Sequence, residues 1–245
     1  MTTDYDTIAE EYKQAKLQPW RQHIESFTLM GLTGSLVGKA VVDLACGEGF
    51  YTRLLRQHGA ARVLGVDLSG RMVGLAQAQE ANDPLGIEYV VGDGRNLALG
   101  AEYDLAVAAY LLNYARNRDE LGAMCRGIAR CLKPGGRFVT ANTNPGIDLR
   151  SAPSYRKYGF ETHIGGELRE GAPITWTFFL HGGSIAVENY YLDVAAHEAA
   201  FRSAGFREVR WHRPRLSLQG EHAHDRGYWA RFLDNPPVIF IECLT

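Results

Sequence analysis

The feature that most constrains the fold is an alternation of short apolar runs with amphipathic segments, which begins at Ala40. This alternation is typical of a parallel sheet with helices on both faces. Ser69 is a natural N-cap for a helix, and Lys133-Pro134-Gly135-Gly136 turns the chain from a helix into a strand. The pattern predicts strands over 40–45, 62–68, 87–92, 103–110 and 137–142, with helices over 51–58, 69–81 and 118–132.

The alternation breaks after Asn142, where residues 145–173 are rich in Gly, Pro and polar side chains. Two apolar runs over 174–180 and 184–192 then flank His181-Gly182-Gly183, which predicts a hairpin with a glycine-bearing turn. A helix near 194–204 and strands near 208–215 and 238–244 resume the regular pattern. We therefore expect one domain over 1–245, with an insertion over 145–192 on the substrate side of the fifth strand.

Composition and charge argue against several classes of protein. The chain has 245 residues, of which 46% are hydrophobic and 22% charged, as in an ordinary globular protein. Its net charge of −2, with no basic stripe, argues against a nucleic-acid partner. Its apolar runs are too short to span a membrane, and its N-terminus resembles no secretory signal. The four cysteines lack the spacing of a metal site, so we expect reduced thiols and no bound metal. We expect a cytoplasmic monomer or homodimer.

The strongest local signal is the segment Val41-Val42-Asp43-Leu44-Ala45-Cys46-Gly47-Glu48-Gly49. An apolar strand is followed by a tight turn with two glycines, which opens a helix. Glycine lets the backbone turn sharply and lets a ligand lie against the main chain. Enzymes that bind nicotinamide dinucleotides share such a loop, but their fingerprint needs a third glycine or alanine where this chain has Thr52. Asp43 is expected to hold the loop by hydrogen bonds.

Two further acidic residues end the next two strands. Asp67 lies in Val66-Asp67-Leu68-Ser69, about twenty residues after the glycine-rich loop, where a carboxylate can accept from both ribose hydroxyls. Asp93 lies in Gly92-Asp93-Gly94, where an acid can accept from an adenine amino group. A helix-capping role for Asp67 and a turn role for Asp93 are the alternatives.

Three acid-ended strands in this order resemble the class I S-adenosylmethionine-dependent methyltransferase family, in its small-molecule type. Leu132-Lys133-Pro134-Gly135-Gly136 resembles the family's turn before the fifth strand, and residues 5–12 resemble its helix that closes over the cofactor. Segments at Tyr5 and Tyr12, Asn113-Tyr114, Lys157-Tyr158-Gly159 and Gly227-Tyr228-Trp229 resemble the toxoflavin N-methyltransferase branch. The resemblance implies a Rossmann-like, doubly wound α/β fold with a seven-stranded mixed sheet whose last strand is antiparallel.

The resemblance also implies a set of site residues, with S-adenosyl-L-methionine as cofactor and S-adenosyl-L-homocysteine as product. Arg21 suits the methionine carboxylate because a guanidinium binds carboxylates through two hydrogen bonds, although an exposed helix cation is equally consistent. The residues expected to bind the cofactor are Tyr12, Arg21, Ala45, Cys46, Gly47, Gly49, Asp67, Leu68, Met72, Asp93, Gly94, Ala109 and Tyr110. His163, His181 and Tyr12 are the candidate catalytic residues, and Tyr5, Asn113, Tyr158 and Trp176 the candidate substrate contacts.

The predicted reaction is methyl transfer to a nitrogen or oxygen of a small molecule, with residues 1–35 forming a helical lid. Non-methyl chemistry on the same cofactor, such as cyclisation, and a nicotinamide oxidoreductase remain alternatives. DNA amino-group methyltransferases carry Asn/Asp-Pro-Pro-aromatic after the fourth strand, where this chain reads Ala109-Tyr110-Leu111-Leu112-Asn113-Tyr114. Asn235-Pro236-Pro237 precedes the last strand instead. Trp176 and Phe178 should share one face of the hairpin, where core packing is the alternative to a pocket wall.

Overall fold

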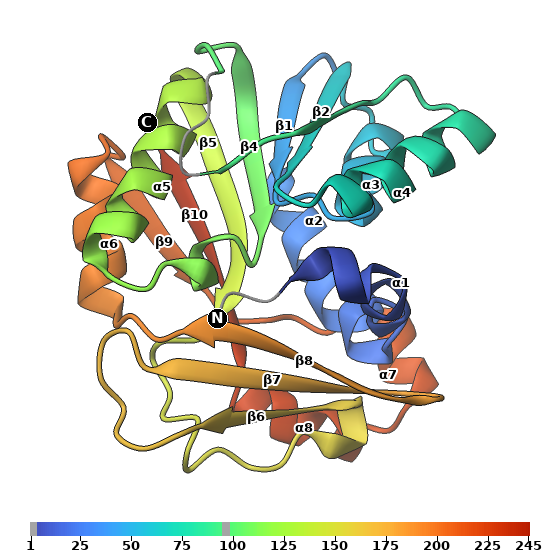
Figure 1. Ribbon diagram of the computed structural model, residues 1–245, viewed down its shortest axis with the longest axis vertical. Coiled ribbons are helices and arrows are strands. Elements are labelled where there is room, and N and C mark those ends of the chain that lie inside the picture. The colour runs from blue at the N-terminus through green and yellow to red at the C-terminus, as the bar shows by residue number, and fades with distance from the viewer. Residues whose placement is uncertain (1–3, 95–98) are drawn as a thin grey trace.

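A seven-stranded sheet lies above a smaller three-stranded sheet in the computed structural model, which describes residues 4–94 and 99–245 (Figure 1). The large sheet consists of β1 (Ala40–Leu44), β2 (Arg62–Asp67), β3 (Glu88–Val91), β4 (Tyr103–Ala109), β5 (Leu132–Thr143), β9 (Glu208–His212) and β10 (Val238–Leu244). Its order is β3-β2-β1-β4-β5-β10-β9, with β10 antiparallel to both neighbours. The predicted mixed sheet with a reversed last strand is confirmed.

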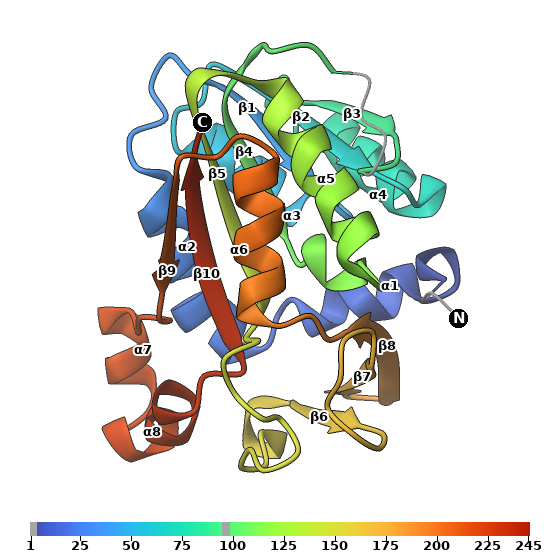
Figure 2. The same cartoon turned by 90° about the vertical axis from the view of Figure 1, so that its left-hand side faces the viewer.

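Helices cover both faces of the large sheet (Figure 2). On one face lie α2 (Phe27–Thr33), α3 (Phe50–Gln57) and α4 (Gly70–Asn82), and on the other lie α5 (Arg118–Cys131) and α6 (Val194–Ser203). Successive strand residues point to opposite faces, so Val41 packs into the core beneath α3, whereas Val42 packs into the core beneath α5. Strands that are apolar on both faces explain the unbroken apolar runs in the sequence.

The predicted helix boundaries agree with the observed ones to about one residue. The predicted turn before β5 differs from the structure. The Ser69 hydroxyl accepts the backbone N–H of Met72 at 3.0 Å, as expected of an N-cap. The Lys133–Gly136 segment does not form a separate turn, because β5 already begins at Leu132. Tyr103 of β4 pairs with Leu132 of β5, and Leu105 pairs with Arg137. The pairing register therefore shifts between these two pairs, and the extra residues of β5 form an irregularity of that strand.

The segment between β5 and α6 contains the small sheet. It consists of β6 (Phe160–Ile164), β7 (Pro173–Leu180) and β8 (Gly183–Tyr190), paired antiparallel in the order β6-β7-β8. The predicted hairpin is present, and Leu180 pairs with Gly183 across a two-residue turn. Trp176 and Phe178 share its buried face, as alternation requires. The sequence pattern missed β6, because it is a short strand within a segment rich in turn residues.

The remaining helical segments lie at the two ends of the chain and beside the small sheet. They are α1 (Tyr5–Ala15), a π-helix η1 (Arg21–Ser26), two 3-10 turns η2 (Leu112–Tyr114) and η3 (Arg156–Tyr158), α7 (Leu218–Ala223) and α8 (Arg226–Asp234). Helix α1 contacts α4, β7 and β8 and so lies between the two sheets (Figures 1 and 2). Helices α7 and α8 were not predicted, since six and nine residues show too few turns to establish a period.

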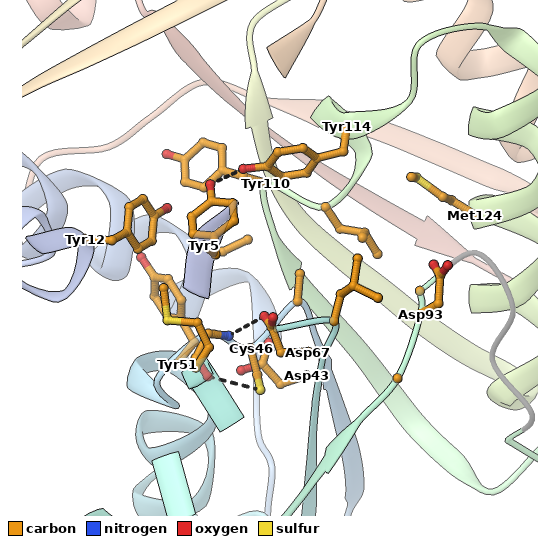
Figure 3. A pocket seen from close by; sticks show the side chains of 18 of the residues that line it. Tyr5, Tyr12, Asp43, Cys46, Tyr51, Asp67, Asp93, Tyr110, Tyr114 and Met124 are labelled. Atoms are coloured by element: carbon orange, nitrogen blue, oxygen red, sulfur yellow. Dashed lines mark hydrogen bonds between the residues drawn. The ribbon is translucent and has the colours of Figure 1, made fainter. Parts of the chain in front are cut away.

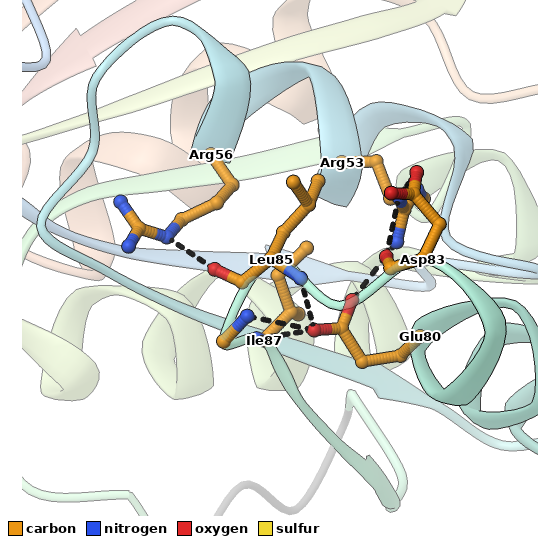
Figure 4. Close-up of polar contacts among 7 residues, drawn as sticks. Arg53, Arg56, Glu80, Asp83, Leu85 and Ile87 are labelled. Atoms are coloured by element: carbon orange, nitrogen blue, oxygen red, sulfur yellow. Dashed lines mark hydrogen bonds and ion pairs between the residues drawn. The ribbon is translucent and has the colours of Figure 1, made fainter.

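A partly buried polar cluster fixes the connection between α4 and β3 (Figure 4). Arg53 of α3 donates to the Glu80 carboxylate at 2.9 Å and to the Asp83 carbonyl oxygen at 2.9 Å. One oxygen of Glu80 accepts the backbone N–H groups of Leu85, Gly86 and Ile87. This cluster sets where β3 begins and therefore where Asp93 emerges beyond its carboxyl end. Across the described residues, the helices are too short or too polar to cross a membrane.

Candidate functional site

Two cavities lie between the large sheet, α1 and the small sheet. The larger has a volume of about 280 Å³ and opens at the carboxyl ends of β1, β2 and β4, where open α/β sheets bind ligands. The smaller, of about 20 Å³, lies between η1 and the strands β7 and β8. Four tyrosines line both cavities and so form the wall between them: Tyr5, Tyr12, Tyr110 and Tyr114.

The glycine-rich loop forms the floor of the larger cavity. The Gly47 backbone N–H donates to Asp67 Oδ2 at 2.8 Å, and the Ser69 N–H donates to Asp67 Oδ1 at 2.9 Å. Gly47 has a φ of 57°, and a Cβ added there would meet no atom within 4 Å. The loop therefore presents bare backbone to the cavity, and the Asp67 carboxylate holds the loop while also lining the cavity.

Gly49 is required for a different reason from the one the sequence suggested. Its φ is 89°, and an added Cβ would lie 2.5 Å from the hydroxyl oxygen of the buried Tyr89. Gly49 does not line the larger cavity. The absence of a side chain at Gly49 makes room for Tyr89 behind the loop, whereas Gly47 faces the open space of the cavity.

Asp43 is buried at the end of β1 beside the larger cavity. It accepts the Thr52 hydroxyl at 2.6 Å, which ties the strand to the first turn of α3. Burial raises the pKa of Asp43 to about 7, although the Thr52 hydrogen bond opposes this rise. Thr52, which departs from the dinucleotide fingerprint, thus serves as the hydrogen-bond donor that satisfies Asp43.

Backbone strain is concentrated at the same edge of the sheet. Ala45 and Tyr110 have φ values of 57° and 71°, and they are the non-glycine residues in the left-handed region within 4–94 and 99–245. Both line the larger cavity, just beyond β1 and β4 respectively. Strained residues persist where the surrounding structure over-determines them and cluster at functional sites. The strain supports this edge as the site.

A buried ion pair joins the wall tyrosines to the N-terminal segment. Arg21 Nη1 lies 3.0 Å from both carboxylate oxygens of Glu25, and both side chains are almost fully buried. Tyr51 and Tyr110 each donate their hydroxyl to Glu25. Burial would lower the pKa of Arg21, but the charge of Glu25 and the neighbouring tyrosines raise it. Arg21 therefore stays cationic within an almost completely filled network.

Burial holds the hydroxyls of Tyr5 and Tyr110 in the wall, and of the neighbouring Tyr51, in the protonated form. The hydroxyls of Tyr5 and Tyr114 hydrogen bond to each other, which links α1 to η2 (Figure 3). Burial raises the pKa of Tyr5, Tyr51 and Tyr110 well above the ordinary value of tyrosine. These hydroxyls are hydrogen-bond donors at neutral pH and poor proton acceptors. Asp93 and Met124 lie at the opposite end of the cavity (Figure 3).

The structure brings most of the predicted cofactor residues together, since all of them except Arg21 and Gly49 line the larger cavity. Of the predicted substrate contacts, Tyr5 lines both cavities and Trp176 the smaller one. Asn113 lines neither and accepts the Thr143 backbone N–H at 3.1 Å. Tyr158 also lines neither, and its hydroxyl donates to the Tyr228 carbonyl at 2.5 Å.

Neither candidate catalytic histidine reaches a cavity. His163 lies on β6 and His181 in the hairpin turn, and both are exposed. Neither lines the larger or the smaller cavity, whereas Tyr12, the third candidate, lines both. The sequence placed the histidines in the correct segment, but it could not show that they point away from its buried face.

Sequence reasoning missed several lining residues. Tyr5, Tyr12 and Lys16 recur at spacings of seven and four, which places Tyr5 and Tyr12 on one face of α1 and Lys16 on the same side at its C-cap. That spacing could have identified Lys16, whose ammonium lies 5.3 Å from the centroid of the Tyr12 ring and 5.2 Å from that of Tyr51. The missed lining residues are Lys16, Tyr51, Gly92, Leu111, Tyr114, Arg116, Glu120 and Met124.

Comparison with known proteins agrees with this geometry. A family model described as a methyltransferase domain matches residues 41–136. The chain is 27% identical over 222 residues to N-demethylindolmycin N-methyltransferase of Streptomyces griseus, covering 85% of this chain and 90% of that relative. It is 28% identical over 223 residues to a ubiquinone/menaquinone biosynthesis C-methyltransferase of Desulfotalea psychrophila, covering 89% and 84%.

The fold is also similar to that of a solved S-adenosylmethionine-dependent methyltransferase of Mesorhizobium loti. The TM-score is 0.66 at 24% identity, with 94% of this chain and 100% of that chain covered. The sheet order, the glycine-rich loop and the acids at the strand ends define a class I methyltransferase fold. The chain is an S-adenosylmethionine-dependent methyltransferase.

Asp67→Ala should weaken binding of S-adenosylhomocysteine roughly 5- to 150-fold, because a charged hydrogen-bond acceptor leaves the cavity. Isothermal titration calorimetry measures this dissociation constant. Asp104→Ala is the matched control, since Asp104 also accepts a backbone N–H (Ala40, 2.8 Å) but lies at the amino end of β4. Equal affinities of the Asp67 variant and the wild type would remove Asp67 from the site.

Gly47→Ala and Gly49→Ala should separate binding from stability. In Gly47→Ala the new methyl group stands in open space over the loop, so affinity for S-adenosylhomocysteine should fall roughly tenfold or more, with stability lowered by about 1–2 kcal/mol. Gly49→Ala should lose more stability, because its methyl group overlaps Tyr89. Urea unfolding and calorimetry on both variants provide the test. A Gly49 variant as stable as the wild type would contradict the packing role.

Proposed function

We propose that the enzyme transfers a methyl group to a nitrogen atom of a small molecule. The observation that carries this proposal is the cavity wall, in which the hydroxyls of Tyr5 and Tyr110 are held protonated and neither candidate histidine takes part. When bound, S-adenosylmethionine supplies a methyl group on a positively charged sulfur, which a lone pair can displace directly. A neutral amine or ring nitrogen already has that lone pair at neutral pH, whereas a phenol or alcohol needs a base.

The residues of the larger cavity fit the cofactor. Gly47 leaves room for it against the backbone, Asp67 offers acceptor oxygens for its ribose, and Asp93 lies at the opposite end for its adenine. Lys16 supplies a cation close to Tyr12 and Tyr51. Arg21, which the sequence favoured for the methionine carboxylate, is occupied by Glu25 and lines the smaller cavity. We therefore assign the carboxylate to Lys16.

Lys16→Met should raise the dissociation constant of S-adenosylhomocysteine roughly 5- to 50-fold, because the carboxylate loses its cationic partner. Methylthioadenosine lacks the amino-acid group and should bind the wild type and the variant equally. Calorimetry with both ligands makes the comparison. An equal loss of affinity for the two would show that Lys16 supports the fold of the site and does not bind the carboxylate.

The acceptor is proposed to enter between the wall tyrosines and the small sheet. Helix α1 carries Tyr5 and Tyr12 over the larger cavity, and β7 supplies Trp176 and Phe178 below the smaller one. The N-terminal segment and residues 145–192 would then form the two sides of an acceptor site. Residues 1–3 of the proposed lid lie outside the described residues. A site closed by these rings excludes water and orients the nitrogen, and orientation alone can be worth roughly 7–11 kcal/mol.

The relatives support a small-molecule acceptor and show that the acceptor atom varies. The Streptomyces griseus relative is named an N-methyltransferase and the Desulfotalea psychrophila relative a C-methyltransferase. Both align with more than four fifths of this chain. The protonated tyrosine wall favours the first of these two acceptor types for this chain.

A panel of amines, ring nitrogens and phenols, assayed with deuterated-methyl cofactor and mass spectrometry, tests the function. Methylated products should carry the label on nitrogen. The double variant His163→Ala, His181→Ala should retain kcat/KM within about twofold, since a general base would contribute 100-fold or more. Preferential labelling of phenols, or a hundredfold loss of activity in the double variant, would contradict the proposal that a nitrogen lone pair attacks the methyl group without help from these histidines.

A further inference from the structure

The smaller cavity is lined by two buried side chains that each carry an N–H group without a partner. Arg21 is 1% exposed and Trp176 is 3% exposed, and both line this cavity. Among the described residues, neither Arg21 Nε nor Trp176 Nε1 has a hydrogen-bond partner. Buried donors are almost always paired, because an unpaired one costs about 1–3 kcal/mol. Two unpaired donors on residues that line one cavity therefore indicate a ligand group that accepts hydrogen bonds there.

The surrounding structure holds both side chains in place, and neither N–H group has an acceptor within hydrogen-bond distance among the described residues. Glu25 already accepts from Arg21 Nη1 and from the hydroxyls of Tyr51 and Tyr110. The Trp176 ring is stacked with Phe178 at a centroid distance of 6.1 Å, and the Arg21 guanidinium lies 5.1 Å from the centroid of that same Phe178. Both side chains therefore lie beside the same aromatic ring. Arg21 also begins a π-helix, a rare geometry that is frequent at functional sites.

The size and charge of the cavity define the group that fits. About 20 Å³ is close to the space that one water molecule needs, so the cavity admits a single oxygen-sized group and not a whole acceptor. Glu25 already neutralises Arg21. A further anion here would be buried without a cation of its own, which is costly. A neutral oxygen atom that accepts hydrogen bonds fits both the volume and the charge of the cavity.

We propose that the smaller cavity binds a neutral carbonyl oxygen of the methyl acceptor, with Arg21 Nε and Trp176 Nε1 as its donors. This inference rests on the proposed function, because it requires the acceptor to extend past Tyr12 and Tyr110, which line both cavities. The acceptor class is then a small molecule with a nucleophilic nitrogen near the cofactor and a carbonyl group on its far side. Arg21 and Trp176 determine specificity and do not contact the cavity that holds the cofactor.

Binding of non-reacting probes tests the subsite without requiring turnover. The full-length protein, saturated with S-adenosylhomocysteine, is titrated with benzamide, benzoate and toluene and followed by NMR. Trp176→Phe removes one N–H and keeps an aromatic ring, and Arg21→Lys keeps the charge beside Glu25 but removes Nε–H. Trp211→Phe is the matched control, since Trp211 Nε1 is also buried and unpaired but lines neither cavity.

The wild type should bind benzamide roughly tenfold or more tightly than toluene, and more tightly than benzoate. Trp176→Phe and Arg21→Lys should each reduce this preference at least about fivefold, whereas Trp211→Phe should leave it unchanged. No saturable benzamide binding, equal binding of benzamide and toluene, tighter binding of benzoate, or an equal effect of Trp211→Phe would overturn the inference. If the protein prefers benzamide as expected but methylates no nitrogen acceptor, the proposed function alone would be overturned.

Discussion

The buried ion pair between Arg21 and Glu25 is the interaction on which the site depends. Charges removed from water must be paired and hydrogen bonded, or the cost of burial is several kcal/mol for each. Glu25 meets this requirement with Arg21 from its own helical segment, Tyr51 from α3 and Tyr110 from the end of β4. One carboxylate therefore fixes the N-terminal segment against the large sheet and sets the wall between the two cavities.

A second carboxylate, that of Asp67, organises the side of the wall that faces the larger cavity. Asp67 accepts the backbone N–H groups of Gly47 and Ser69, so the loop after β1 and the start of α4 are positioned by one side chain. Burial raises the pKa of Asp67 despite these two hydrogen bonds. The left-handed backbone at Ala45 and Tyr110 lies at the same edge. Hydrogen-bonded polar groups and local backbone strain thus coincide at the larger cavity, where we propose that the cofactor binds, while the sheet below is apolar on both faces.

The small sheet shares its core with the large one. Phe160, Trp176 and Phe178 belong to the same buried cluster as Val41 and Leu55 of the large sheet and its helices. Trp20 connects them, with its ring 5.0 Å from that of Phe160. A pocket wall built on a shared core moves little relative to the scaffold, because packed interiors resist deformation. The proposed acceptor subsite consequently rests on the same packing that supports the cofactor loop.

The sequence by itself determined most of the strands and helices, the glycine-rich loop and the acids Asp43, Asp67 and Asp93, because period and strand-end position are local properties of the chain. The order of the strands in the sheet came from the tertiary structure. It could not show that Gly49 packs on Tyr89 while Gly47 faces the cavity, since the two glycines have the same local pattern. Nor could it show that Lys16, and not Arg21, lines the cofactor cavity, or that His163 and His181 are exposed. These outcomes depend on residues far apart in the chain. Only tertiary packing decides which partner a side chain meets.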